Sequence, residues 1–327
     1  MFSPAAMEML QQLGLKKGRA NLEEFSDTLQ ALATADPRII VVTSDSRGSG
    51  KLVPFGKALP KQIVEVGIAE QNLVGITAGL AASGKKAFGV SPSCFLTARS
   101  LEQIKNDLCY SNVPGVLIGI SSGVSYGALG STHHSLHDLA VLRAIHNLTL
   151  LVPADNFESR EAIRYAAAAS RPVFVRFGKA AMHDLHPPGT RFSVGQALPL
   201  RAGNDVAFIA NGETVVHAVL AAARLAAEGI QARVLSLPTV KPLDTAAVLA
   251  AGRECRAVIT VEEHMVNGGV GEAVASTLLL AGVCPRFKMI GFPDEDTVTG
   301  AQADLFRHYG ISMEGLAATA RGLLAAK

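Results

Sequence analysis

Residues Val64–Asn72 read VEVGIAEQN and run on into LVGITAGLA at residues 73–81. The short, β-branched segment Ile63–Val66 predicts a buried strand. From Ala69 onward, apolar residues recur at the spacing of one helical stripe, at Leu73, Ile76 and Leu80. The stretch therefore predicts a strand that turns sharply into a helix, with Glu70 in the first helical turn.

Strands and helices continue to alternate on both sides of this stretch. Short apolar runs predict further strands at residues 39–43, 86–90, 116–120, 148–152 and 173–177, and the segments between them favour helices, one of them near 95–109. Residues 183–192 contain adjacent prolines and follow neither period, which is typical of a linker. A second alternation of strands and helices occupies the remainder of the chain.

This order predicts an α/β fold of two consecutive doubly wound domains, each with a mainly parallel sheet covered on both faces by helices. We expect an N-terminal lead-in at residues 1–18, a first domain at 19–182, the linker at 183–192 and a second domain at 193–327. Ligands of open sheets bind beyond the carboxyl ends of the strands. A functional site is therefore expected in the loops that follow the strands.

The composition describes a well-packed globular chain. Hydrophobic residues make up 49% of the 327 residues, the mean hydropathy is +0.28, and the formal net charge is +2 with acidic and basic residues interspersed. We therefore expect neither nucleic acid nor a membrane as a partner. The four cysteines lack metal-ligand spacing and the N-terminus does not resemble a secretory signal, which favours a reducing, cytoplasmic setting.

Glu70 has two interpretations. A carboxylate near a helix start gains roughly 0.3–1 kcal/mol from the helix dipole, which would account for the residue without a function. The run around it, however, resembles the segment that carries the activating glutamate in the pyrimidine-binding domain of transketolase-like thiamine diphosphate enzymes. This resemblance implies that Glu70 is catalytic and bonds the aminopyrimidine ring of the cofactor, with Ile68 and Phe95 as further cofactor contacts. Ala98 stands where sugar transketolases commonly carry a second stacking aromatic residue.

Residues 123–138 contain three histidines, His133, His134 and His137. We expect no metal here, because no acidic or cysteine ligand has a confirming spacing. The segment resembles the Gly-Pro-Thr-His-Gln segment of transketolases, which implies that His133 contacts the sugar substrate near the reacting carbon. Leu129 replaces the aspartate that usually reads a sugar hydroxyl, which indicates a changed donor or acceptor.

Three further residues are candidate contacts for the substrate and its phosphate. Arg47 and Ser49 lie in a loop that resembles the substrate-entrance loop of the family, and a solvated loop is the alternative. Arg176 ends a buried strand, and its counterpart in transketolases lies close to the substrate phosphate. The alternative for Arg176 is an ion pair with a structural carboxylate, because an unpaired buried charge is costly.

The resemblance covers roughly residues 20–327 but only two of the three domains of a full transketolase. The third domain would hold the cofactor diphosphate and Mg²⁺ through a Gly-Asp-Gly motif, which the sequence lacks. The resemblance therefore implies a split transketolase that transfers a two-carbon ketol unit between phosphorylated sugars. A second chain would supply diphosphate and magnesium binding, and the expected assembly is an α2β2 heterotetramer.

Other functions fit part of the pattern. Beta subunits of 2-oxo-acid dehydrogenases share the two domains, but they usually carry a proline shortly before the glutamate and a His-Ser-Gln loop, where this chain has Gly67–Ala69 and Thr132–His134. Deoxyxylulose-phosphate synthases share the Gly-Ile-Ala-Glu-Gln run but ordinarily keep all three domains in one chain. A non-catalytic assembly subunit is the alternative from a different class, although the retained Glu70 and His133 favour catalysis.

Overall fold

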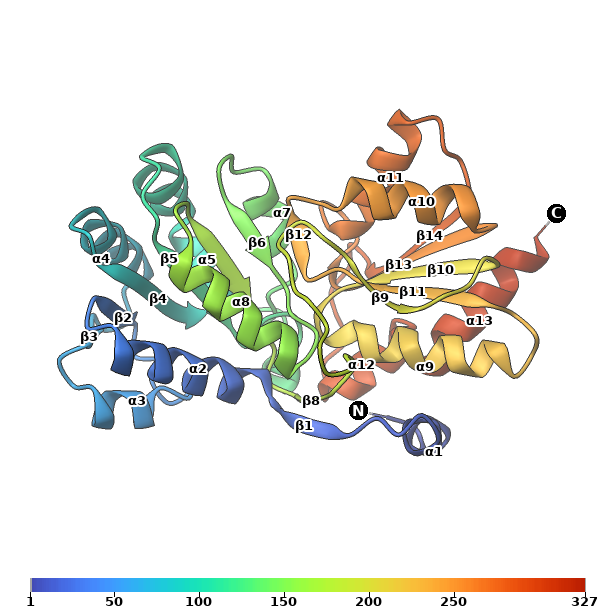
Figure 1. Ribbon diagram of the computed structural model, residues 1–327, viewed down its shortest axis with the longest axis horizontal. Helices are drawn as coiled ribbons and strands as arrows, with labels where there is room; N and C mark the ends of the chain where they lie inside the picture. Colours follow the sequence, from blue (N-terminus) through green and yellow to red (C-terminus); the bar gives the residue numbers. More distant parts are fainter. Residues whose placement is uncertain (1, 327) are drawn as a thin grey trace.

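The structure, a computed structural model that describes residues 2–326, has two α/β lobes lying side by side (Figure 1). The first lobe is built on a seven-stranded sheet of order β12-β6-β7-β5-β4-β2-β3, and the second on a five-stranded sheet of order β14-β13-β10-β11-β9. Only the pairs β12–β6 and β11–β9 within these two sheets are antiparallel. The prediction of two doubly wound units with mainly parallel sheets is confirmed.

The strands of the first sheet are β2 (Ile39–Thr43), β3 (Ile63–Glu65), β4 (Lys86–Pro92), β5 (Val116–Ile120), β6 (Thr149–Leu151), β7 (Val173–Arg176) and β12 (Thr239–Lys241). The helical segments of this lobe are α2 (Asn21–Ala35), α3 (Val53–Ala58), α4 (Glu70–Ala82), α5 (Ser93–Arg99), α6 (Leu101–Gln103), η1 (Ile104–Tyr110), η2 (Gly127–Leu129), α7 (Asp138–Arg143) and α8 (Asn156–Ala168).

The strands of the second sheet are β9 (Leu198–Arg201), β10 (Val206–Ala210), β11 (Ala232–Ser236), β13 (Ala257–Met265) and β14 (Arg286–Phe292). Its helical segments are η3 (Gly212–Thr214), α9 (Val215–Ala226), α10 (Thr245–Glu254), α11 (Val270–Leu280), α12 (Gln302–His308) and α13 (Met313–Ala325). The N-terminal α1 (Pro4–Gln12) packs against α9, and β1 (Lys17–Ala20) pairs with β8 (Ala181–His183).

Strand periodicity explains how both faces of the sheets are covered. In β5, Val116 and Ile118 pack into the core under α2 and α8, whereas Leu117 between them packs with α4 on the opposite face. In β10, Phe208 packs with α9 and α13, whereas Ile209 packs with α10 and α11. Because side chains alternate along a strand, uninterrupted apolar strands are stable only when both faces are covered.

Two features differ from the sequence prediction. The helix expected near residues 95–109 is broken into α5, α6 and the π-helical η1. At this break the Ser100 hydroxyl donates to the Leu96 carbonyl, and the Thr97 hydroxyl donates to the Ser93 carbonyl; such side-chain bonds bend helices. The second difference is β12, a strand from the second half of the chain that extends the first sheet by pairing with β6.

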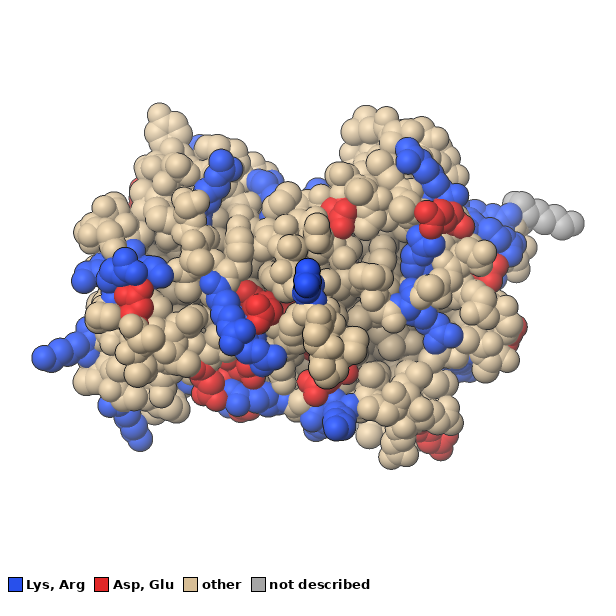
Figure 2. All heavy atoms as spheres, viewed as in Figure 1, with Lys and Arg blue, Asp and Glu red and all other residues tan. Residues whose placement is uncertain are grey.

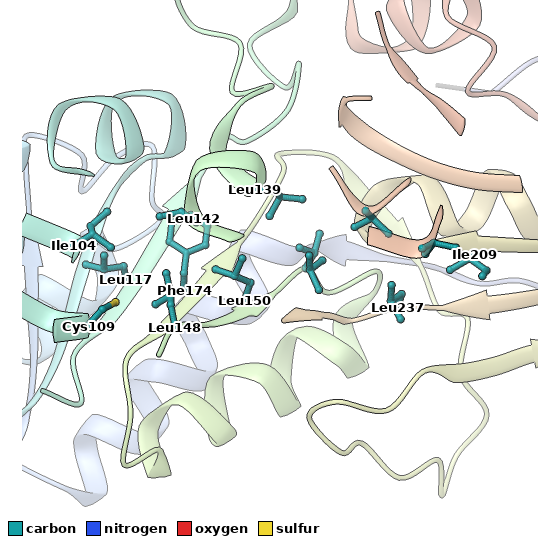
Figure 3. Close-up of a cluster of buried hydrophobic side chains, with 14 of the residues drawn as sticks. Ile104, Cys109, Leu117, Leu139, Leu142, Leu148, Leu150, Phe174, Ile209 and Leu237 are labelled. Atoms are coloured by element: carbon teal, nitrogen blue, oxygen red, sulfur yellow. The ribbon is translucent and has the colours of Figure 1, made fainter. Parts of the chain in front are cut away.

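An apolar core runs without interruption from one lobe into the other. Figure 3 shows Leu117, Leu142 and Leu150 of the first lobe in line with Leu237 and Ile209 of the second. All five side chains are buried in one cluster. The two lobes therefore share a hydrophobic core.

Buried carboxyls reinforce this junction. Glu263 accepts the backbone N–H of Val124 at 2.9 Å, and Glu213 accepts that of Ala180 at 3.3 Å. Both donors lie in loops that follow strands of the first sheet. Gln302 of α12 donates through Nε2 to both carboxyls, at 2.8 Å to Glu263 and 2.6 Å to Glu213. The second lobe thus holds the loops beyond β5 and β7 in place.

On the face shown in Figure 2, lysines and arginines are scattered, with fewer acidic residues among them, and form no continuous patch of one sign. Among the helices of residues 2–326, none is both long enough and apolar enough to cross a membrane.

The carboxyl pair at the junction predicts a pH-dependent stability. Burial, and then the neighbouring Glu213, raises the pKa of Glu263 to about 8, and burial raises the pKa of Glu213 to about 7. The unfolded chain loses these protons near the ordinary carboxyl pKa, so the stability they contribute is present at acidic pH and is lost as the pH rises through about 7 to 8. We expect the wild type to lose free energy of unfolding relative to Glu263→Gln from about pH 4.5, where the unfolded carboxyls lose their protons, up to about pH 8, and to keep a constant difference above that pH.

Urea unfolding across this pH range measures the difference between the two proteins. The exposed carboxylate variant Glu102→Gln is the control and should follow the wild type. A difference between wild type and Glu263→Gln that does not change with pH would contradict the prediction.

Candidate active site

Glu70 is the first residue of α4, and only 4% of its side chain is exposed. The Arg99 guanidinium, at the end of α5, donates through Nη1 to both carboxylate oxygens, at 3.0 and 2.9 Å. Together with Ile68, Gln71 and other residues of the turn, this pair lines an open cavity of about 570 Å³. Ile68 is 73% exposed at its edge. The predicted cofactor residues Glu70 and Ile68 therefore lie in the same cavity.

The turn before Glu70 is shaped by Glu65, the last residue of β3. Its carboxylate accepts the backbone N–H groups of Gly67 and Asp45 and the hydroxyl of Thr43, at 3.1, 2.7 and 2.8 Å. Gly67 has a φ of +72°, a left-handed conformation that favours glycine. These contacts fix the sharp strand-to-helix turn that the sequence predicts.

A row of stacked side chains begins at Arg99. Its guanidinium carbon lies 4.5 Å from the centroid of the Phe95 ring. The Phe95 ring meets His133 edge-to-face at 5.3 Å between centroids, and His133 meets Tyr126 at 5.4 Å. The Lys179 ammonium lies 4.3 Å from the Tyr126 centroid. The row brings together the predicted residues Phe95 and His133.

This row follows the carboxyl ends of four parallel strands. Glu70 comes after β3, Phe95 after β4, His133 after β5, and Lys179 after β7. This is the edge at which open parallel sheets bind their ligands. The arrangement offers a buried carboxylate at one end, an aromatic wall and an imidazole in the middle, and an ammonium at the other end.

The loop that carries His133 is held from both sides. The imidazole Nδ1 of His133 lies 2.9 Å from the Thr132 hydroxyl. Its neighbour His134 is buried and bonds the carbonyl of Gly127 at 2.9 Å and the hydroxyl of Thr297, from the second lobe, at 3.2 Å. Burial lowers the pKa of His134, so this imidazole stays neutral near pH 7. His133 is thus the member of the pair that faces the row.

Arg176 lies inside the protein. Its Nε donates to the Asp138 carboxylate at 2.9 Å, and its Nη2 donates to the backbone carbonyls of Ser135 and Glu263 at 3.0 and 2.8 Å. Burial raises the pKa of Asp138, but the Arg176 and His264 charges outweigh it and hold that pKa below the ordinary value. Asp138 is therefore the structural carboxylate that the alternative interpretation of Arg176, an ion pair, requires. A direct contact of Arg176 with the substrate stays a prediction, and this buried placement does not favour it.

Arg47 and Ser49 make contacts close to their own loop. Arg47 lies 3.4 Å from the Glu65 carboxylate, and the Ser49 hydroxyl donates to the Ser46 carbonyl at 3.2 Å. Leu129 is 55% exposed at the end of η2, so its side chain is available to a ligand or partner. Substrate binding by Arg47 and Ser49 stays a prediction.

Three residues of the row were not singled out in the sequence: Arg99, Tyr126 and Lys179. Arg99 carries the most accessible signal, because it lies four residues after Phe95 and this spacing brings two side chains together on a helix. Ala98, where a stacking aromatic residue was expected, is exposed, and the contact on the Phe95 ring comes from Arg99 instead. Within residues 2–326, His, Cys, Asp and Glu side chains form no group of three that could hold a metal ion.

Comparison with known proteins identifies the fold and the family. The family description "Transketolase, pyrimidine binding domain" matches residues 18–183, and "Transketolase, C-terminal domain" matches residues 195–316. The chain belongs to the transketolase family. It is 48% identical over 299 residues to a subunit of the apulose-4-phosphate transketolase of Phocaeicola vulgatus, covering 91% of this chain and 95% of that protein.

Further relatives have the same extent. The transketolase subunit of Clostridium sp. that is named for 6-deoxy-6-sulfo-D-fructose is 34% identical, covering 78% of this chain and 80% of that protein. A solved split-gene transketolase, described as an inactive β4 tetramer, superposes with a TM-score of 0.86 at 32% identity, covering 94% of this chain and 99% of that chain. These relatives favour a split transketolase over a 2-oxo-acid dehydrogenase subunit.

A full-length transketolase, that of Campylobacter jejuni, shares the fold with a TM-score of 0.80 at 19% identity. The match covers 94% of this chain but only 47% of the longer one. This chain is therefore similar in fold to about half of a full-length transketolase.

The buried ion pair makes a testable contribution to stability. Removing one partner leaves the other charge buried and unpaired, so we expect Arg176→Met and Asp138→Asn each to lower the free energy of unfolding by about 3–5 kcal/mol. The double variant should lose clearly less than the sum of the two losses, because it leaves no isolated charge. Urea unfolding of the wild type and the three variants measures this coupling, and simple additivity would show that the pair does not act as a unit.

Proposed function

We propose that this chain is the subunit of a split transketolase that binds the aminopyrimidine side of thiamine diphosphate, and that it works only with a second chain that binds the diphosphate and Mg²⁺. The observation that carries this proposal is Glu70, a nearly buried carboxylate at a helix start, which lines an open cavity next to an aromatic wall. When bound, the cofactor supplies the thiazolium that stabilises the two-carbon unit during ketol transfer between sugars.

The residues at the cavity fit the cofactor's pyrimidine end. Glu70 offers a carboxylate, which suits a ring nitrogen that shares or receives a proton, and the half-buried Phe95 ring beneath Arg99 suits a flat heterocycle. The Glu70 carboxylate and the Phe95 ring both contact the guanidinium of Arg99, which is itself planar and rich in nitrogen. Glu70 would orient the ring and hold the proton at its nitrogen, while Phe95 would fix the plane of the ring.

The other end of the row suits the substrate. Thr132 engages Nδ1 of His133, which leaves Nε2 for a sugar oxygen near the reacting carbon. Lys179 stands beyond Tyr126, and burial, followed by the repulsion of the Lys51 charge, lowers its pKa. We propose that Lys179, with Lys51, attracts the anionic end of the substrate.

The names of two relatives include an anionic ketose, apulose-4-phosphate in one case and 6-deoxy-6-sulfo-D-fructose in the other. We propose a ketose phosphate as the substrate here, with apulose-4-phosphate as the first compound to assay. Leu129 presents an apolar surface where the family commonly reads a hydroxyl, which supports a donor that differs from the ordinary sugar phosphates.

The proposed assembly is an α2β2 heterotetramer. The Glu70 cavity is open, its edge residue Ile68 is exposed, and a group that binds diphosphate is expected from the second chain. The alternative function is a non-catalytic assembly subunit that has kept the fold, and the fate of activity in a Glu70 variant separates the two.

We expect Glu70→Gln to lower the turnover number of the reconstituted pair by about two to four orders of magnitude, because the amide cannot share a proton with the ring nitrogen as a carboxyl does. The partner to test is the product of a neighbouring open reading frame, if one carries a Gly-Asp-Gly motif, and the assay follows ketol transfer from apulose-4-phosphate with thiamine diphosphate and Mg²⁺. Glu102→Gln is the matched control and should keep normal turnover. Near-normal turnover of the Glu70 variant would favour the assembly subunit.

We expect Lys179→Met to raise the KM for a phosphorylated ketose roughly three- to ten-fold while kcat changes little, because the lysine would bind the ground state and the transition state equally. The KM for a ketose without phosphate should stay constant. Steady-state kinetics with both substrates measures the difference, and Lys288→Met on β14 controls for the loss of one surface charge. An equal change in KM for both ketoses would contradict a contact between Lys179 and the phosphate.

A further inference from the structure

The proposed function gives Glu70 and Phe95 roles in cofactor binding but gives no role to Arg99, which contacts both. Its Nη1 contacts both oxygens of Glu70, and its guanidinium carbon lies over the Phe95 ring, 4.5 Å from the centroid. These are the carboxylate and the ring that the proposed cofactor site requires. One planar cation therefore engages both features of the pyrimidine position at once.

We propose that Arg99 is a placeholder for the aminopyrimidine, which keeps the site formed before thiamine diphosphate binds and has to move aside when it does. This inference rests on the proposed function, because it takes the Glu70 cavity as the pyrimidine site. A guanidinium suits this task, since it is flat, donates hydrogen bonds to a carboxylate and stacks on aromatic faces. Arg99 then sets the affinity of the chain for its cofactor.

Burial explains why Glu70 needs such a partner. Only 4% of its side chain is exposed, and a buried carboxylate without a counter-charge or hydrogen bonds is unfavourable. The two Arg99 bonds satisfy both of its oxygens. Without Arg99, the carboxylate would face the cavity alone until the cofactor arrived.

Exposure explains why Arg99 is exchangeable. Its side chain is 49% exposed, and it leaves α5 at the helix end, next to an open cavity of about 570 Å³. A single nitrogen serves both oxygens, so the pair lacks the two parallel N–H bonds of a bidentate arginine. The guanidinium can therefore rotate toward solvent through its own torsions, with the backbone of α5 unchanged.

The placeholder competes with the cofactor for the same two contacts. We expect Arg99→Met, in the reconstituted pair, to bind thiamine diphosphate roughly three- to ten-fold more tightly, because a half-exposed ion pair and one cation–π contact no longer have to be broken. Arg99→Lys keeps the charge without the flat stacking group and should lie between wild type and Arg99→Met.

Calorimetric titration with thiamine diphosphate and Mg²⁺ measures these affinities without reference to turnover. Arg38→Met, which removes an exposed arginine paired with Asp36 before β2, is the control and should bind like the wild type. The Glu70→Gln background provides a second test. If Arg99 acts through Glu70, replacing Arg99 should change the affinity less in Glu70→Gln than in the wild type.

Thermal unfolding provides a third measurement on the same proteins. Without cofactor, Arg99→Met should melt at a lower temperature than the wild type, and saturating thiamine diphosphate should close or reverse this gap. Arg99→Lys keeps a positive charge beside Glu70 and guards against an Arg99→Met variant that fails to fold.

The outcomes separate this inference from the proposed function. Equal or weaker cofactor binding by Arg99→Met and Arg99→Lys, when the wild-type pair binds thiamine diphosphate, would overturn the placeholder alone and make Arg99 an inert or direct cofactor contact. Absence of thiamine diphosphate binding by the wild-type pair would overturn the proposed function and the placeholder together. Tighter cofactor binding by Arg99→Met than by the wild type, with this gain lost in the Glu70→Gln background, would support the placeholder role of Arg99.

Discussion

The Asp138 carboxylate is fully buried at the start of α7, and the row of site residues depends on it. Arg176 at the end of β7 balances its charge, and the hydroxyls of Ser93 and Ser135 donate to the same carboxylate oxygen as Arg176, at 2.7 and 2.9 Å. Ser93 begins α5, which carries Phe95, and Ser135 ends the loop that carries His133. One buried charge therefore fixes the relative positions of three strand ends, and charge–hydrogen-bond networks of this kind are rigid when every partner is present.

The second lobe completes this support. Arg176 also donates to the backbone carbonyl of Glu263, whose side chain accepts from the loop beyond β5, and Thr297 bonds His134 behind the row. None of these second-lobe groups lies in the row itself. Their contacts make the loops beyond β5 and β7 part of a shared interior, so a lobe that contributes no side chain to the row still supports its shape.

The sequence predicted best what depends on near neighbours. The turn at Gly67, the helix start at Glu70 and the two sheets follow from local periodicity and turn chemistry. The sequence predicts that Arg176 could pair with a carboxylate but not which one, because Asp138 is brought next to Arg176 only by the folding of the chain. The contact between Glu263 and Val124 joins residues 139 positions apart, and no local pattern indicates it. Arg99 differs from these, because its spacing of four residues from Phe95 is a local helical signal.

The two sides of the row differ in a way that bears on how the site works. Behind it, Arg176 and Asp138 are buried and hydrogen-bonded to each other and to groups within the chain, whereas Ile68 and Leu129 on the open side are exposed. A rigid rear wall lets Phe95 and His133 keep their positions while Arg99 alone changes place. The chain therefore combines a permanent charge pair, which cannot be broken without a large loss of stability, with an exchangeable one at Glu70. This division confines the expected rearrangement to a single side chain at the point where the cofactor is proposed to bind.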